Sequence, residues 1–465
     1  MARATSLWLT FVDLSGSRTR TIHELHKKYG HAVRVAPNEL SLSNVECIKE
    51  IYGQQTSFMK AEVYDTMSLR PFGIFGMRNK DDHSQRRRLL SHAFAQSSLT
   101  STEPLIRSHI EKLLGLVWKK VNEPIDVVYF FRLLAFDVVG DLFLGQSFGG
   151  LDTSDPPEFL VDMDLHFIAA GIEANFPPLY KILNHTPLPS VRHLFESRNR
   201  AHEFGRKALQ RYLATYGRES GRKDLLSKVV CLKSETGEPN LTDLEIYTEI
   251  ANLVSAGTDT TSMTLTYMFW ELAKQPDWQK RLSEELDQNI AQSTTSVAAY
   301  ADLVHLPILD AIVQEALRLH PAAPASLPRE TPAGGRVLNG IHVPERTTVS
   351  MQCYTTQRDP SVFTDPDRFD PTRYLYDQSN EMKEMFMPFS KGTRACIGKN
   401  LALMELKLIT AALIREFSVG LALQCTEDSM TMMDHFLVLP KGGRCDLVFT
   451  PRREVAMKQP GLSNT

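Results

Sequence analysis

The order of apolar and polar positions predicts a chain made mostly of helices. Apolar residues recur at helical spacing over the stretches 102–149, 159–172, 190–216, 241–274, 307–319 and 397–414. A proline-rich connection at 177–189 separates two of these stretches, because proline ends helices. Shorter alternating runs predict small strands at 32–43, 335–352 and 417–449. The predicted fold class is therefore mainly α, with small β-sheets.

The segment 60–81 follows neither period, although it is rich in aromatic and apolar side chains. A loop of this length inside a compact domain is usually functional or disordered. A loop that simply packs on the surface is the alternative.

The helix predicted over 241–274, capped by Thr242 or Asp243, is interrupted by a run of small and hydroxylated residues, 255–261. Such residues cost stability in mid-helix, so they suit a helix that passes close to something flat and deforms there. Asp259 beside Thr260 also offers a proton source and a relay. A seam of small residues for helix packing is an equally simple explanation of the run.

Cys396 is the centre of the strongest local pattern, Phe389-Ser-Lys-Gly-Thr-Arg-Ala-Cys-Ile-Gly398, which leads directly into a predicted helix. The free N–H groups and the dipole of a helix N-terminus lower a thiol pKa and favour the metal-binding thiolate. One thiolate without neighbouring ligands is a poor zinc site. It suits the axial position of haem iron, whose macrocycle supplies the other donors. A buried structural cysteine is the alternative interpretation.

Composition narrows the function and the organisation. The 465 residues carry a formal charge of -3 with both signs spread along the chain, which argues against a nucleic-acid partner. Six scattered cysteines give no disulfide framework and suit a reducing compartment. We expect one domain over 20–450, a polar tail over 451–465, and a segment 1–19 too short in apolar residues for a membrane anchor. A truncated chain and an anchorless protein both explain that segment.

The cysteine pattern resembles the haem-binding loop of the cytochrome P-450 family at every position. Three further motifs stand in family order: Ala256-Gly-Thr-Asp-Thr260, Glu315-Ala-Leu-Arg318 and Pro366-Asp-Arg-Phe369, where Asp367 replaces the usual Glu. Arg373, in the following Pro371-Thr-Arg-Tyr, matches as well. The runs 34–39 and 91–94 look most like members that tailor secondary metabolites in filamentous fungi. The resemblance implies a large helical domain with small sheets around a buried haem.

The resemblance also implies roles for single residues. Cys396 would bind the iron, and Asp259 and Thr260 would be the catalytic acid–alcohol pair. The other residues that would contact the cofactor are His83, Arg87, Ala256, Gly257, Arg329, Phe389, Arg394 and Gly398. The structural triad would be Glu315, Arg318 and Arg368. The substrate pocket would include Phe72, Phe75, Ala323, Ala325 and Leu327. It would lie under the 60–81 loop and a lid made of the helical stretches 159–172 and 190–216 with the proline-rich connection between them.

The implied reaction is insertion of one oxygen atom from O2 into an apolar small molecule, by hydroxylation or epoxidation. The chain has no flavin or dinucleotide fingerprint, so NADPH would act through a separate cytochrome P-450 reductase, with cytochrome b5 as a second donor. The reductase would dock on a basic surface near Arg86, Lys391 and Lys399. We expect an intracellular protein, at the cytosolic face of the endoplasmic reticulum if attached peripherally and cytoplasmic otherwise. The alternatives are a reductase-independent isomerase or dehydratase of the same fold and a non-enzymatic haem sensor or carrier.

Overall fold

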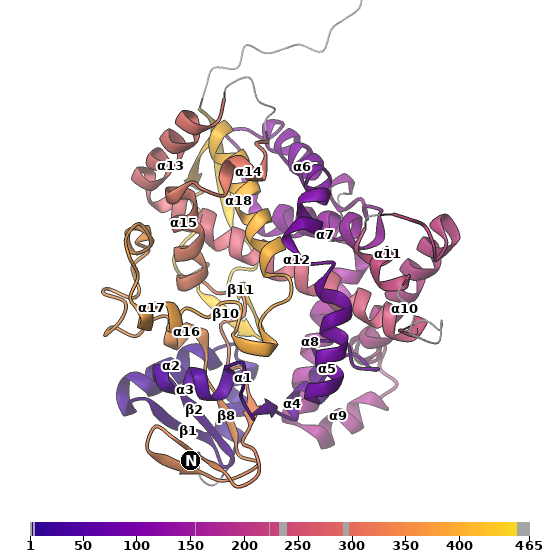
Figure 1. The fold of residues 1–465 in the computed structure, drawn as a ribbon, viewed down its shortest axis with the longest axis vertical. Coiled ribbons are helices and arrows are strands. Elements are labelled where there is room, and N and C mark those ends of the chain that lie inside the picture. The colour runs from indigo at the N-terminus through magenta and orange to yellow at the C-terminus, as the bar shows by residue number, and fades with distance from the viewer. Residues whose placement is uncertain are drawn as a thin grey trace, which may run out of the picture.

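Helices form most of the chain in the computed structural model, which describes residues 2, 5–153, 155–222, 224–231, 240–291 and 297–452 (Figure 1). The helices are α1 (Leu7–Leu14), α2 (Arg18–Tyr29), α3 (Val45–Tyr52), α4 (Val63–Met67), α5 (Lys80–Ser91), α6 (Gln96–Trp118), α7 (Val127–Leu144), α8 (Glu158–Asn175), α9 (Pro177–Asn184), α10 (Pro189–Tyr216), α11 (Leu225–Val230), α12 (Asp243–Lys274), α13 (Pro276–Asn289), α14 (Tyr300–Leu303), α15 (Pro307–Leu319), α16 (Cys353–Thr356), α17 (Asn380–Met385) and α18 (Lys399–Glu416). Short 3-10 turns lie at η1 (Gly150–Asp152), η2 (Pro371–Tyr374) and η3 (Gly392–Arg394). Most of the expected tail, 453–465, lies outside the described residues.

The strands form small sheets, as the short alternating runs predict. They are β1 (Ala32–Ala36), β2 (Glu39–Leu42), β3 (Met59–Lys60), β4 (Pro124–Asp126), β5 (Arg329–Glu330), β6 (Arg336–Leu338), β7 (Ile341–Val343), β8 (Thr348–Ser350), β9 (Phe417–Leu421), β10 (Met432–His435), β11 (Leu437–Pro440) and β12 (Asp446–Pro451). A five-stranded sheet has the order β1-β2-β8-β5-β3, and β4-β12-β9 form a second sheet. The larger sheet lies beside α1, α2 and α3 at the N-terminal end of the molecule (Figure 1).

Helix α12 lies at the centre of the helical part and packs against α7, α10, α15 and α18. Its N-terminus carries a capping box, in which Thr242 and Glu245 satisfy each other's backbone N–H groups. Most of its remaining residues are buried in the largest apolar core. The expected long helix over 241–274 is therefore present and capped by Thr242.

Two expected irregular segments are more regular than the sequence predicts. The 177–189 connection holds α9, because Pro177 and Pro178 occupy the first helical positions, where proline is tolerated. The 60–81 segment begins at the end of β3 and then forms α4. Within the region 417–449, where small strands are expected, residues 432–440 form a hairpin, β10–β11, with Phe436 between the strands. Among the described residues, no helix has the length and apolarity needed to cross a membrane.

Candidate functional site

The loop that ends at Gly398 holds Cys396 between the turn η3 and helix α18. The backbone N–H of Cys396 donates to the carbonyl of Phe389 at 2.8 Å, which closes the loop. Gly392 has a φ of +64°, and a Cβ at that position would lie 2.0 Å from the carbonyl oxygen of Tyr52. A side chain at position 392 would therefore force the loop away from α3.

Cys396 is an exposed residue, but its sulfur is surrounded by protein atoms, and this local burial opposes the effect of the helix N-terminus on the thiol. The burial raises the pKa of this thiol, although the backbone N–H groups of Gly398 and Lys399 and the Arg87 guanidinium favour the thiolate. The expectation that the loop and helix alone lower the thiol pKa is therefore wrong, because desolvation outweighs them. A metal ion binds only the thiolate form of cysteine, so metal binding would stabilise the Cys396 thiolate where the surrounding protein groups do not suffice.

Four basic side chains expected at the cofactor lie in one cluster: His83 and Arg87 on α5, Arg329 on β5 and Arg394 in the cysteine loop. Burial and the neighbouring Arg394 lower the pKa of His83 to about 3. Burial and Arg329 likewise lower the pKa of Arg394 to about 10. The hydrogen-bond acceptors are all backbone carbonyls: Ala395 for Arg87 (2.7 Å), Leu327 and Pro328 for Arg329 (3.4 and 3.0 Å), and Met77, Arg78 and Asn79 for Arg394 (2.6, 2.8 and 3.1 Å).

This cluster lacks an acidic partner. No carboxylate among the described residues forms an ion pair with any of its four members, whereas most other arginines of the chain have one. Arg329 is buried, and Arg87 and Arg394 are half-buried. Cations withdrawn from water are normally paired with anions, so the cluster fits an anionic group. The carboxylates of the haem propionates are such groups, and the cluster lies against the cysteine loop through Arg87 and Ala395. The residues present therefore fit a haem.

Near the middle of helix α12, one residue of the otherwise largely buried helix is exposed. Ala256 is exposed while Ser255 and Thr258 on either side are buried. The Thr260 hydroxyl donates to the Ala256 carbonyl one turn back, at 2.7 Å. Gly257 lies on another side of the helix, where a Cβ would meet a methyl of Val139 on α7 at 2.8 Å. Gly257 thus packs closely on a neighbouring helix, as the packing explanation of the 255–261 run predicts, and Ala256 is exposed. A local deformation of α12 against a flat group stays a prediction.

Asp259 does not face solvent but forms an ion pair. The Arg132 guanidinium, on α7, donates to the Asp259 carboxylate at 2.8 Å and to both oxygens of Asp164, on α8, at 2.9 and 2.6 Å. Burial raises the pKa of Asp259 despite the nearby guanidinium. Arg132 therefore links the predicted acid on α12 to the predicted lid helix α8.

Glu315 and Arg318 on α15 form a fully buried pair. Both side chains have 0% exposure, and two guanidinium N–H groups of Arg318 donate to Glu315 at 2.7 and 2.8 Å. The backbone N–H of Asp370 donates to the same carboxylate at 2.8 Å. A buried ion pair needs such additional partners to offset desolvation.

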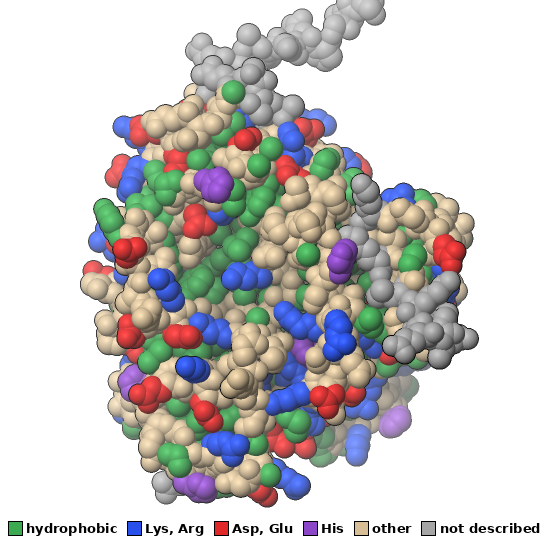
Figure 2. All heavy atoms as spheres, in the orientation of Figure 1, with side chains coloured by type: hydrophobic (Ala, Val, Ile, Leu, Met, Phe, Trp, Pro, Cys, Tyr) green, Lys and Arg blue, Asp and Glu red, His purple; other side chains and the backbone are tan. Residues whose placement is uncertain are grey.

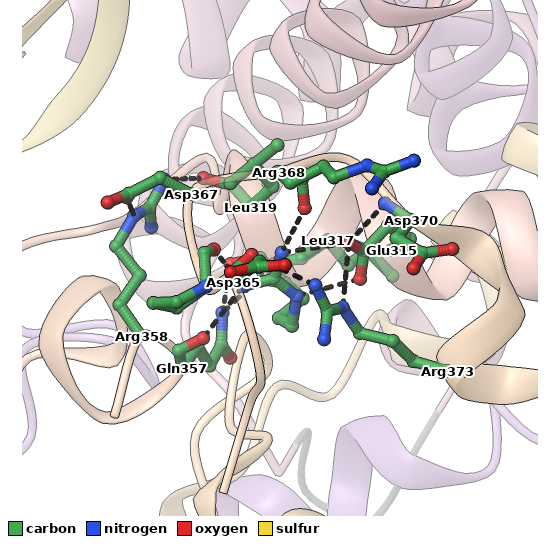
Figure 3. Close-up of polar contacts among 12 residues, drawn as sticks. Glu315, Leu317, Leu319, Gln357, Arg358, Asp365, Asp367, Arg368, Asp370 and Arg373 are labelled. Carbon is green, nitrogen blue, oxygen red and sulfur yellow. Dashed lines mark hydrogen bonds and ion pairs between the residues drawn. The ribbon is translucent and has the colours of Figure 1, made fainter. Parts of the chain in front are cut away.

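The third arginine of this group is Arg373, not the predicted Arg368 (Figure 3). The Arg373 guanidinium lies 3.3 Å from Glu315, whereas Arg368 contributes only its carbonyl, to Arg318 at 3.1 Å. The two arginines belong to successive Pro-x-Arg-aromatic repeats five residues apart. Only the path of the chain through η2 shows which of them reaches Glu315.

The predicted pocket residues come from segments that the fold brings together. Ala323, Ala325 and Leu327 are partly exposed and alternate with three buried neighbours, as expected for one face of an extended segment. The Phe75 ring contacts the Phe436 ring, with centroids 5.6 Å apart. Phe72 is also partly buried, and the guanidinium of Arg70 lies 5.2 Å from its ring.

Sequence reasoning missed Phe436, which connects the 60–81 segment to the lid. Its ring stacks on Phe167 of α8 at 5.6 Å, besides contacting Phe75. Its φ of +81° is unusual for a non-glycine residue, and no glycine or asparagine marks this turn in the sequence. Arg132 was missed as well, although it interrupts the apolar run 127–136, and that interruption is a usable signal.

The comparisons with known proteins agree with this geometry. The family model for cytochrome P-450 matches residues 4–446. The chain belongs to the cytochrome P-450 family. It is 33% identical over 437 residues to cytochrome P-450 monooxygenase tazI of Aspergillus terreus, which covers 93% of this chain and 88% of that protein. It is 30% identical over 460 residues to monooxygenase stcB of Emericella nidulans, which covers 97% and 87%.

The fold of a P-450 is also seen in the solved structures. The crystal structure of the cytochrome P-450DA haem domain matches 94% of each chain with a TM-score of 0.80 and 18% sequence identity. The expectations for the family, the mainly helical fold and the monooxygenase class are thus confirmed. The family and its fold carry a cysteine-ligated haem iron and take electrons from a redox partner.

The basic surface expected for that partner of the P-450 is only partly available. Arg86 is buried and pairs with Glu245 and Glu249 at 2.5 and 2.8 Å, so it does not take part in docking. Lys399 is exposed at the start of α18, and Lys391 pairs with Glu384 at 2.8 Å. Figure 2 shows basic side chains gathered around α5 and this end of α18.

Proposed function

We propose that Cys396 binds the iron of haem b and that the four-member basic cluster holds the haem propionates. The observation that carries this proposal is the convergence of Arg87, Arg329 and Arg394 beside the cysteine loop without any described carboxylate partner. His83 stays neutral in this cluster because burial and Arg394 hold its pKa at about 3, so it acts as a hydrogen-bond donor. Phe389 and Gly398 shape the loop around the sulfur, and Ala256 is the contact from α12.

The bound haem supplies the activation of O2 and its insertion into the substrate. Thr260 and Asp259 supply protons on the α12 side. The Thr260 hydroxyl donates to Ala256 at rest and is free to rotate towards a ligand beside the exposed Ala256. Asp259 is a buried acid with a raised pKa, held by Arg132, so it can exchange a proton when that ion pair loosens.

The substrate is an apolar small molecule. Phe75, Phe167 and Phe436 form an aromatic group between the 60–81 segment, the lid and the β10–β11 hairpin. The partly exposed face of Ala323, Ala325 and Leu327 adds small apolar contacts. A polyketide, a terpenoid or an alkaloid of fungal secondary metabolism is the substrate class that matches both this lining and the fungal relatives.

Electrons come from NADPH through a cytochrome P-450 reductase, with cytochrome b5 as an additional donor. Lys399 and the neighbouring basic side chains favour docking of an acidic partner on the face of the cysteine loop. Exposed apolar side chains on α1 and α9, among them Phe11 (73% exposed) and Ile182 (67%), favour peripheral contact with a membrane. That contact would place the protein at the cytosolic face of the endoplasmic reticulum, and without it the protein would be cytoplasmic.

The test of the cysteine assignment is the reduced, carbon monoxide-bound difference spectrum of purified protein. We expect the long-wavelength Soret band of thiolate-ligated haem, and its loss in Cys396→Ala. A protein that contains haem but shows the same short-wavelength band with and without the Cys396 thiol would contradict the assignment. NADPH consumption with a reductase then separates a monooxygenase from a reductase-independent isomerase and from a haem carrier.

A further inference from the structure

Lys60 is a buried cation whose place in the proposed function has not been assigned. Only 7% of its surface is exposed, and its ammonium group donates to the carbonyl of Phe75 at 2.5 Å. The rings of Tyr64 and Phe75 enclose the ammonium, with centroids 4.2 and 4.5 Å from Nζ. The described residues include a second buried lysine, Lys407, and it pairs with Asp310 at 2.7 Å. Within the part of the chain that the structure describes, no carboxylate pairs with Lys60.

The strand register places Lys60 directly beside another cation. β3 pairs antiparallel with β5, and in that register Lys60 lies opposite Arg329. Directly opposite residues share one face of a sheet, about 5 Å apart at Cβ, so like charges at such positions destabilise the pair. Arg329 is itself buried, and its guanidinium reaches only carbonyls.

The carboxylates of this region are already bound by another arginine. Arg78 pairs with Asp65 and with Glu330, both at 2.9 Å. Glu330 follows Arg329 in the strand, so it points to the opposite face of the sheet. Burial lowers the pKa of Lys60 well below its usual value, and the neighbouring Arg329 and Arg394 lower it further. The face shared by Lys60 and Arg329 therefore holds basic groups that no carboxylate of the described residues neutralises.

We propose that Lys60 binds a propionate of the haem and anchors the segment 61–79 to the cofactor. This inference rests on the haem site proposed above and adds a ligand to it. Lys60 stands at the start of that segment, and the same segment supplies Phe72 and Phe75 to the pocket and the carbonyls that Arg394 binds. The aromatic rings hold the ammonium in place, and the propionate supplies the missing negative charge.

The proposal also bears on the charge of the site. Haem b has two propionates, whereas Lys60, Arg87, Arg329 and Arg394 are four basic groups. A surplus of positive charge favours the addition of an electron to the iron. Lys60 would therefore contribute to a less negative reduction potential.

The test compares wild-type holoprotein with Lys60→Met, Lys60→Arg and Lys407→Met. The measurements are haem transfer to excess apomyoglobin, the reduction potential, and hydrogen exchange over residues 61–79. We expect Lys60→Met to lose haem about ten- to a hundredfold faster, the loss expected for one charged hydrogen bond. It should also have a more negative potential and faster exchange in the segment, while Lys60→Arg resembles the wild type.

Lys407→Met is the matched control, because it removes a buried lysine that has its own carboxylate partner. It should lower the melting temperature and leave the rate of haem loss unchanged. A Lys60→Met protein with wild-type haem loss and potential would overturn the proposal and leave the haem site intact. A wild-type protein that never binds haem would overturn the proposed function and this inference together.

Discussion

Glu315 accepts hydrogen bonds from Arg318, Arg373 and the Asp370 backbone while none of its own surface reaches solvent. A carboxylate in such a place depends on every partner, because removal of one leaves part of the charge unneutralised. Arg318 depends in turn on the carbonyls of Gln357 and Pro366, at 2.9 and 2.7 Å. The group therefore fixes α15 against the segment that leads to the cysteine loop.

Replacement of Arg373 and of Arg368 by alanine should have unequal effects. Arg373→Ala removes a guanidinium from a fully buried carboxylate and should lower the free energy of unfolding by about 3 kcal/mol. Arg368→Ala keeps the carbonyl that Arg318 uses and should cost about 0.5 kcal/mol. Urea unfolding of the two holoproteins, with haem content as a second readout, checks this difference. Equal losses would show that both guanidinium groups support the site.

The same pair of arginines marks a limit of prediction from the sequence at this scale. Glu315 and Arg318 are three positions apart on one helix, so their contact follows from helical geometry. Arg368 and Arg373 both follow a Pro-x pattern, and the distance along the chain to Glu315 is similar for both. Lys60 is a comparable case, since it pairs with Arg329, 269 positions later in the chain, through a strand register.

At the scale of elements, α7, α8 and α12 are held together by Arg132 and two carboxylates. Asp259 is buried, whereas the side chain of Asp164 is 44% exposed. The Asp259 carboxylate therefore depends more strongly on the Arg132 guanidinium than the Asp164 carboxylate does. The arrangement ties any movement of α8 to the surroundings of the acid on α12. This link can be measured as the coupling free energy between Arg132 and each of the two carboxylates.

Arg132→Gln should destabilise the protein mainly through Asp259. We expect a loss of about 3 kcal/mol in the free energy of unfolding, since a buried carboxylate loses its cation. The loss should be much smaller in an Asp259→Asn background and only slightly smaller in an Asp164→Asn background, because exposed charges interact weakly. A double-mutant cycle by urea unfolding measures both couplings. Equal couplings at the two carboxylates would contradict this prediction.

His166 on α8 should make the lid sensitive to acid. Its side chain is buried, and burial and Arg198 lower its pKa to about 4; His202 faces it from α10. The unfolded chain binds the proton near pH 6.5, so the stability from this group is present above that pH and is lost as pH falls. Between pH 7 and pH 5 the loss should be about 2 kcal/mol in the wild type.

The check is urea unfolding at several pH values for the wild type and His166→Gln. Glutamine keeps a donor for the Met67 carbonyl, which the imidazole Nε2 reaches at 3.3 Å, but it does not titrate. The variant should therefore have a flatter dependence of stability on pH over this range. Parallel pH dependences would show that His166 does not bind a proton on unfolding.

The elements themselves were predicted with uneven success for identifiable reasons. The bounds of α15 match the predicted 307–319, because Pro307 and the apolar period mark it clearly. Helix α9 was read as a loop, since its two prolines favour the first helical turn as well as a break. The hairpin tip at Phe436 carries neither glycine nor asparagine, although Asp434 accepts the Phe436 N–H at 3.0 Å, and the contacts of Phe436 with Phe75 and Phe167 depend on the tertiary fold.

At the scale of the whole molecule, the face with the cysteine loop should control electron transfer. Lys399→Glu should slow reduction by an NADPH-cytochrome P-450 reductase about tenfold at low salt, with a smaller difference at high salt. A glutamate at the first turn of α18 is compatible with the helix dipole, so the fold should tolerate the change. Stopped-flow reduction under carbon monoxide measures the rate.

Lys27→Glu is the control for this experiment, because Lys27 is exposed on α2, on a different part of the molecule. It should leave the reduction rate unchanged. The carbon monoxide spectrum of Lys399→Glu must remain that of the wild type, since Lys399 also influences the Cys396 thiol. Unchanged reduction at low salt would place the docking surface elsewhere.

The position of Gly392 against Tyr52 has a consequence for the order of events during synthesis. The cysteine loop rests on the end of α3, with room for no more than a hydrogen atom between them. The ribosome makes Tyr52 early and Gly392 near the end. The cysteine loop can therefore pack on α3 and form the iron site only when nearly the whole chain has been synthesised. A nascent P-450 of this kind therefore captures its cofactor after translation of the loop, and a chain interrupted before residue 392 remains colourless.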